Sequence, residues 1–213
     1  MRFAILALAA TLTATTASAS QIPFDGSWKH QKFSLFSGND YTPRGSALDV
    51  SSDGSVSLFY RALPETVWRS SGASWDWQVS QSVPPTNLAL KGGDDRNLAL
   101  YFVFLPQAEA ERSRGKRVTR LLSSENVRVL VYVWGGAHAR GAVLDSPYLG
   151  ARGKTVVLRG AGTGQARESV DLAADFRRAF GGQATSLVGL AVSGDSDDTD
   201  TMIRARISSL TMR

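Results

Sequence analysis

The sequence contains no cysteine among its 213 residues, so disulfides, thiolate metal sites and thiol nucleophiles are all excluded. Histidine is almost as scarce, because only His30 and His138 are present. Neither histidine belongs to an H-E-x-x-H zinc motif, and the chain has no G-x-S-x-G nucleophile elbow. The common zinc-hydrolase and serine-hydrolase chemistries therefore have no motif to support them.

Long apolar runs are also missing, since no segment approaches the roughly 20 apolar residues that a membrane-spanning helix needs. At the N-terminus, Arg2 precedes a short apolar run over residues 3–10 and an Ala17-Ser18-Ala19 cleavage pattern. This arrangement predicts a signal peptide over residues 1–19 and a single mature domain over residues 20–213. An exported chain without disulfides fits the bacterial periplasm, which is the location that the sequence predicts.

Negative charge is in deficit, with 24 Lys and Arg against 19 Asp and Glu, a net charge of +5 and a pI of about 9.8. The densest basic cluster runs from Arg112 to Arg120 and follows Glu109 and Glu111 in a polar connection. No motif of interleaved basic and aromatic residues accompanies it, so the sequence predicts no nucleic-acid partner. An anionic lipid or an acidic glycan is a better match for the surplus positive charge.

Short β-branched and aromatic runs, separated by Gly, Pro, Asp and Ser, dominate the mature chain. With almost no alternating helices, they predict an all-β fold, an antiparallel β-sandwich or jelly roll similar to carbohydrate-binding modules. In the last run, Ile203, Ala205 and Ile207 alternate with polar residues and are expected to face inward. The predicted strands cover residues 46–50, 55–61, 74–79, 98–104, 127–134, 155–159, 187–192 and 202–210.

One amphipathic helix is predicted near residues 170–180, with Ser169 as its N-cap and Gly181 after its last turn. Leu172, Phe176 and Phe180 share one face at a spacing of four residues, so the helix is expected to pack across one end of the sandwich. A weaker helical pattern covers residues 108–123, which is equally compatible with a long surface loop.

Two acidic motifs stand at strand ends. Asp94 and Asp95 directly precede the run LALYFVF, and the stretch GDSDDTDT over residues 194–201 follows LVGLAVS. If the strands flanking GDSDDTDT pair, the stretch is a hairpin tip whose carboxylates repel one another. Asp195, Asp197 and Asp198 are therefore candidate calcium ligands, although the spacing does not match an EF-hand loop. The alternative is an ordinary turn whose aspartates pair with Arg204 or Arg206.

Aromatic side chains suggest a ligand platform on the sheet. Trp75 and Trp77 share one strand face, and Tyr132 and Trp134 repeat this spacing on another strand. Rings on a sheet face can stack on sugar rings while neighbouring polar groups, here Asp94, Asp95 and Arg96, bind hydroxyls. The alternative is that these aromatic residues belong to the core. Trp134, at a strand end beside glycines, is the ring most expected to be exposed.

An enzyme on the same scaffold is the alternative function. A glycan hydrolase or lyase needs two carboxyl groups, and Asp94 or Asp95 is expected to pair with Asp175 or Asp195. Asp94 and Asp95 themselves are adjacent in an extended segment and should point to opposite faces. The sequence favours a non-catalytic saccharide- or glycan-binding domain over this enzyme, and a structural or assembly protein of the envelope is the third possibility.

Several segments together resemble a bacterial family catalogued as domain of unknown function 3047. In this family the second acidic motif is typically D-T-D-N-T, and here Ser196 and Asp198 replace its first Thr and its Asn. The resemblance implies an exported, single-domain β-sandwich similar in outline to carbohydrate-binding modules, and it implies no particular activity. The segments that carry the resemblance are WDWQVS (75–80), KGGDDRNLALYFVF (91–104), VLVYVWG (129–135), SPY (146–148), VVLRG (156–160), DLAADFRRAFG (171–181) and GLAVSGDSDDTDT (189–201).

Overall fold

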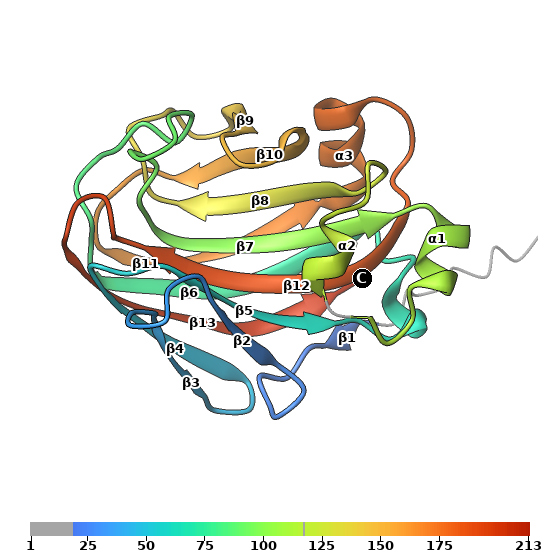
Figure 1. Cartoon of the computed structure of the whole chain (residues 1–213), viewed down its shortest axis with the longest axis horizontal. Coiled ribbons are helices and arrows are strands. Elements are labelled where there is room, and N and C mark those ends of the chain that lie inside the picture. The colour runs from blue at the N-terminus through green and yellow to red at the C-terminus, as the bar shows by residue number, and fades with distance from the viewer. Residues whose placement is uncertain (1–18, 117) are drawn as a thin grey trace, which may run out of the picture.

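A computed structural model describes residues 19–116 and 118–213, so the predicted signal peptide, apart from its last residue, lies outside the described residues. Two β-sheets pack face to face as a sandwich (Figure 1). Within the described part of the chain, no helix is long and apolar enough to span a bilayer. The predicted all-β sandwich is confirmed.

The smaller sheet has six strands. Five of them follow the order β11, β6, β13, β4 and β3. The sixth, β1, pairs with the C-terminal end of β13. All of these pairs are antiparallel. The strands are β1 (Ser20–Gln21), β3 (Asp40–Pro43), β4 (Ala47–Asp53), β6 (Gly72–Gln81), β11 (Gly164–Asp171) and β13 (Met202–Met212).

The larger sheet has seven strands in the order β2, β5, β12, β7, β8, β10 and β9. Its pairs are antiparallel except for β8 and β10, which run parallel. The strands are β2 (Lys29–Lys32), β5 (Ser57–Ala62), β7 (Arg96–Leu105), β8 (Arg128–Trp134), β9 (Val143–Ser146), β10 (Gly150–Arg159) and β12 (Ser186–Asp195).

Each predicted strand lies within or overlaps an observed one, and Ile203 and Ile207 are buried as the alternation predicts. The strands flanking GDSDDTDT do not pair with each other, because β12 belongs to the larger sheet and β13 to the smaller one. The stretch is therefore a crossover between the two sheets rather than a hairpin tip, which corrects the prediction.

The predicted helix is α3 (Leu172–Phe180), and it packs at one end of the sandwich (Figure 1). Its N-cap is Asp171, whose carboxylate accepts a 2.8 Å hydrogen bond from the backbone N–H of Ala174. The prediction of Ser169 as the cap was wrong, because the helix begins at Leu172 and its cap is the residue immediately before, two positions after Ser169. Gly181 follows the helix with a φ of 69°, a conformation that favours glycine.

Three further helical segments are short. A 3-10 turn covers Glu65–Val67, and the predicted helical pattern over residues 108–123 contains α1 (Gln107–Arg112) and α2 (Val118–Leu121). These segments and α3 lie towards one end of the molecule, whereas the loop before β7 and the β12–β13 crossover lie at the other (Figure 1). The two ends therefore present different sets of side chains.

Candidate functional site

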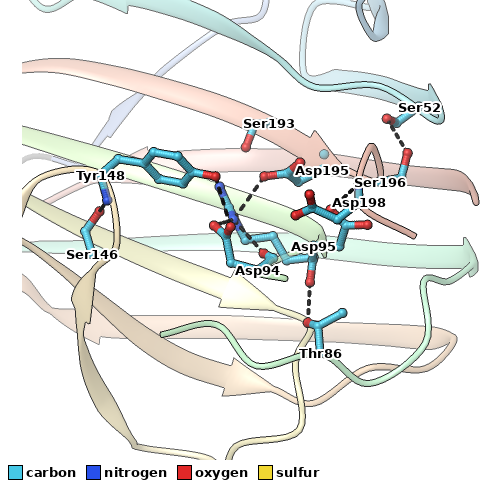
Figure 2. A network of polar contacts seen from close by, with 12 residues as sticks. Ser52, Thr86, Asp94, Asp95, Ser146, Tyr148, Ser193, Asp195, Ser196 and Asp198 are labelled. Atoms are coloured by element: carbon cyan, nitrogen blue, oxygen red, sulfur yellow. Dashed lines mark hydrogen bonds and ion pairs between the residues drawn. The ribbon is translucent and has the colours of Figure 1, made fainter. Parts of the chain in front are cut away.

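The two acidic motifs meet in space at one end of the sandwich (Figure 2). Asp94 and Asp95 precede β7, and Asp195 ends the neighbouring strand β12, where it pairs in register with Arg96. Both Asp94 and Asp95 are buried, with exposed fractions of 2% and 0%. Their side chains contact different partners, as expected for consecutive residues in an extended segment.

Asp95 anchors the β12–β13 crossover. Its carboxylate accepts hydrogen bonds from the backbone N–H of Thr199 at 2.8 Å, from the Thr199 hydroxyl at 2.5 Å and from the backbone N–H of Asp198 at 3.3 Å. Its own carbonyl accepts a 2.6 Å bond from the Thr86 hydroxyl. Because every one of these contacts fixes a loop, Asp95 has a structural role whatever ligand binds at this end.

Arg96 connects Asp94 to Asp195. Its Nη1 atom lies 2.8 Å from Asp94 Oδ2 and 3.1 Å from Asp195 Oδ2, and its Nη2 donates a 2.9 Å bond to the Tyr101 hydroxyl. The Arg96 side chain is 11% exposed, and those of Asp94 and Asp195 are 3% and 6% exposed. This buried network is the partner of Asp195, in place of the predicted Arg204 or Arg206, and Arg206 pairs with Asp49.

One guanidinium serves two buried carboxylates, so the network has an excess of negative charge. Burial raises the pKa of Asp195 to about 8; Arg96 opposes this shift, and Asp197 and Asp94 add to it. The folded state therefore disfavours ionised Asp195. Protonation of Asp195 therefore favours the folded state over the unfolded state. This contribution to stability is fully present below the unfolded pKa of about 4, and it is lost as the pH rises through the folded pKa of about 8.

Tyr148 completes this end of the molecule from the connection between β9 and β10. Its hydroxyl donates a 3.0 Å hydrogen bond to Asp94 Oδ1, while its ring remains exposed, at 56% for the residue. Burial of the hydroxyl and the neighbouring Asp94 carboxylate raise the pKa of Tyr148, so the hydroxyl remains a donor. Lys91 Nζ lies 5.6 Å from the ring centroid. Tyr148 was not among the predicted site residues, and only its SPY segment pointed to it.

A cluster of three carboxylates that could hold a metal ion lies beside this network. One oxygen from each of Asp95, Asp197 and Asp198 lies within 4.8 Å of the others. Asp95 takes the place that the sequence analysis gave to Asp195, because Asp195 turns toward Arg96 instead. Burial raises the pKa of Asp198, and the neighbouring carboxylates of Asp95 and Asp197 add to this rise.

The predicted aromatic platform is wrong. Trp75, Trp77, Tyr132 and Trp134 have exposed fractions of 1%, 2%, 0% and 5% and lie between the two sheets. The Trp77 ring lies 5.4 Å from that of Trp75 and 5.6 Å from that of Trp134, while Trp75 and Tyr132 are 5.7 Å apart. The shared strand faces were identified correctly, but both faces point inward, so these rings form an aromatic core.

Asp175 does not belong to the acidic end either. It lies on α3 at the opposite end of the sandwich (Figure 1), where it accepts a 2.7 Å hydrogen bond from the Tyr132 hydroxyl and pairs with Arg178 at 3.0 Å. The predicted pairing of Asp94 or Asp95 with Asp175 is therefore wrong. Among the acids named as catalytic candidates, the structure brings together Asp94 and Asp195.

The family described as "Protein of unknown function (DUF3047)" matches residues 26–211, so the chain belongs to this family. A comparison with curated proteins gives no match for the sequence.

Three solved structures share the outline of the fold. One is the xyloglucanase domain of NopAA, a type three effector from Sinorhizobium fredii, in complex with cellobiose, at 10% identity and a TM-score of 0.48 over 87% of this chain and 92% of that one. The second is CBM29_1, a family 29 carbohydrate-binding module from Piromyces equi. It has 7% sequence identity and a TM-score of 0.37, and the match covers 92% of this chain and 91% of that one. The third is a loop-swap mutant of Necallimastix patriciarum Xyn11A. It has 10% sequence identity and a TM-score of 0.45, and the match covers 92% of this chain and 94% of that one.

Proposed function

We propose that this protein is a non-catalytic saccharide-binding domain, exported to the periplasm, whose ligand binds at Tyr148, Asp94 and Arg96, here called the Tyr148 site. The observation that carries the proposal is an exposed aromatic ring whose hydroxyl is tied to a buried, ion-paired carboxylate. The tether fixes the ring, so a ligand would not have to order it. The export signal expected at residues 1–19 supports the location.

The chemistry of a sugar matches this arrangement. A pyranose ring has an apolar C–H face and a rim of hydroxyls, and binding sites for small polar ligands combine an aromatic surface with a few polar groups that fix orientation. Tyr148 supplies the surface, and Lys91 beside its ring supplies a hydrogen-bond donor. Asp94 holds the ring through its hydrogen bond to the Tyr148 hydroxyl, and Arg96 forms an ion pair with Asp94 beneath it.

Replacing Tyr148 tests the site. We expect Tyr148→Ala to weaken polysaccharide binding about tenfold or more, as for an aromatic residue at the centre of a binding site. Tyr148→Phe keeps the ring but loses the bond to Asp94, so its loss should be smaller, about threefold. Affinity electrophoresis of residues 20–213 in gels that contain neutral or acidic polysaccharides measures both.

Phe36→Ala is the matched control, because Phe36 is 98% exposed and makes no contact with Tyr148 or Asp94 among the described hydrogen bonds and ring pairs. Equal retardation of wild type and Tyr148→Ala would contradict the proposal. Equal losses in Phe36→Ala and Tyr148→Ala would also contradict it, because binding would then depend on exposed apolar surface in general.

Calcium bound by Asp95, Asp197 and Asp198 is the second part of the proposal, because hard cations prefer clustered carboxylate oxygens. Burial raises the pKa of Asp198, and repulsion from Asp95 and Asp197 adds to the rise; a bound ion would offset that repulsion. It would also hold the crossover in the position that Asp95 fixes.

Melting the chelator-treated protein with and without millimolar calcium tests this part. At about 100 times its dissociation constant, an ion that binds only the folded state adds about 2.7 kcal/mol, so the melting temperature should rise by several degrees. Asp197→Asn/Asp198→Asn should abolish the rise, whereas Asp76→Asn, on the outer face of β6, should retain it. A rise that persists in the double variant would place the ion elsewhere, and no rise at all would exclude calcium.

Glycoside hydrolysis is a second candidate, favoured by the geometry of Asp94 and Asp195. One carboxylate oxygen of each residue lies within 3.1 Å of the same Arg96 nitrogen. These two oxygens are therefore at most about 6 Å apart, which is close to the separation of the two catalytic carboxyl groups in retaining glycosidases. The pKa of about 8 suits Asp195 as an acid. Burial of both carboxyls argues against the reaction, and release of reducing ends from a polysaccharide on incubation with the protein would establish it.

A further inference from the structure

An open cleft of about 500 Å³ is lined by residues of α1 and α3 and of the segments next to them. These helices lie at the end of the sandwich opposite the acidic loops (Figure 1). The segment between the 3-10 turn and β6 forms one side of it, α3 contributes Ala173 and Arg177, and the connection from α3 to β12 closes it. No Asp or Glu is among the described residues that line the cleft, whereas two arginines, Arg69 and Arg177, are.

Both arginines lack a counter-charge within the described ranges 19–116 and 118–213. Neither guanidinium has a carboxylate oxygen within 4.0 Å, although neighbouring arginines do. Arg114 pairs with Glu65 at 2.6 Å, and Arg178, the residue after Arg177, pairs with Asp175 at 3.0 Å. The cleft is therefore lined by two exposed arginines that form no ion pair within the described residues.

The floor of the cleft is fixed by hydrogen bonds. The Trp68 indole N–H donates a 2.9 Å bond to the Leu63 carbonyl, and the Trp68 carbonyl accepts a 2.9 Å bond from the backbone N–H of Leu187. The Ser186 hydroxyl donates a 2.6 Å bond to the side chain of Gln107, which also lines the cleft. A ligand would thus meet a preformed surface, which lowers the entropic cost of binding.

We propose that this cleft binds a small ligand through an oxyanion, a carboxylate, sulfate or phosphate group held by Arg69 and Arg177. A guanidinium is planar and donates paired hydrogen bonds that match such groups. Gln183 and Thr185 line the same cleft and offer amide and hydroxyl groups to the remainder of a polar ligand. The site is separate from the Tyr148 site, and the proposal does not depend on saccharide binding there.

NMR titration of ¹⁵N-labelled residues 20–213 tests the proposal with sodium sulfate, sodium phosphate and galacturonate as probes and neutral galactose as the control. We expect saturable shifts of the amide signals around Arg69, Arg177 and Gln183 with at least one anion and none there with galactose. Because the contacts are charged, raising sodium chloride from 20 to 300 mM should weaken binding, since the added salt shortens the Debye length from about 20 Å to about 6 Å.

Arg69→Gln/Arg177→Gln should weaken anion binding at least about tenfold, since each variant residue loses a charge-assisted hydrogen bond. Arg167→Gln is the matched control, because Arg167 is an exposed arginine on the distant β11 edge whose nearest carboxylate, in Asp76, is 4.0 Å away. An equal loss in Arg167→Gln, unsaturable shifts at all arginines, or no shift with any anion would overturn the proposal. Since Tyr148→Ala leaves this cleft intact, failure here is distinguishable from failure of saccharide binding.

Discussion

Replacing Arg96 with methionine is expected to destabilise the protein by about 3–5 kcal/mol at pH 8, the range for removing one partner of a buried ion pair. Methionine fills much of the volume of the arginine stem but leaves Asp94 and Asp195 buried without their shared cation. The loss should be smaller at pH 5, because Asp195, whose pKa is already raised by burial, would become neutral. Urea denaturation at both pH values measures the difference.

Arg114→Met is the control for this prediction. Arg114 and Glu65 form an ion pair whose side chains are 58% and 53% exposed, so its removal should change the free energy of unfolding by at most about 1 kcal/mol. Equal effects of the two variants would show that Arg96 contributes no more than a surface ion pair. A larger loss at pH 5 than at pH 8 would contradict the account of the charge excess.

Replacing Trp77 with alanine is expected to cost about 3–5 kcal/mol, because it removes a large side chain from the centre of the aromatic core. The ring is 2% exposed and contacts Trp75 and Trp134. Trp77→Phe should cost clearly less, because it keeps an aromatic ring and removes an indole N–H that has no hydrogen-bond partner among the described residues. Thermal and urea denaturation give both values.

Leu35→Ala is the matched control for the core. Leu35 is 91% exposed, so its substitution should stay within about 0.5 kcal/mol of wild type. If Trp77→Ala instead melted like wild type but lost saccharide binding, the tryptophans would form a ligand platform and the core assignment would be wrong. This outcome separates the two roles that the sequence left open.

The strands that the sequence predicts are those whose residues carry a strong signal. Strands β7, β8 and β12 are long apolar runs, and β13 alternates regularly, so their type follows from composition and period. Strands β2, β3 and β9 have four residues each and lie at the edges of their sheets, and β2 and β3 are largely polar. Their existence depends on tertiary contacts that a local pattern does not contain.

For the candidate site too, the sequence shows some residues, whereas their pairing depends on the folded sheet. The sequence identified Asp94, Asp95 and the second acidic motif, because carboxylates at strand ends are visible locally. It could not show that Asp195 turns toward Arg96 while Asp95 joins Asp197 and Asp198, since β7 and β12 become neighbours only in the folded sheet. The aromatic residues had the right spacing, but a period of two gives shared faces without saying which face is buried.

Saccharide binding at the Tyr148 site is tested most directly by NMR of residues 20–213 labelled at tyrosine rings and backbone amides. Titration with neutral and acidic oligosaccharides should give saturable shifts of the Tyr148 ring and of the Asp94 and Leu149 amides. Saturation should disappear in Tyr148→Ala. An oligosaccharide that binds while the Tyr148 ring signals stay unchanged, or a panel that gives no saturable shift at all, would contradict binding at this site.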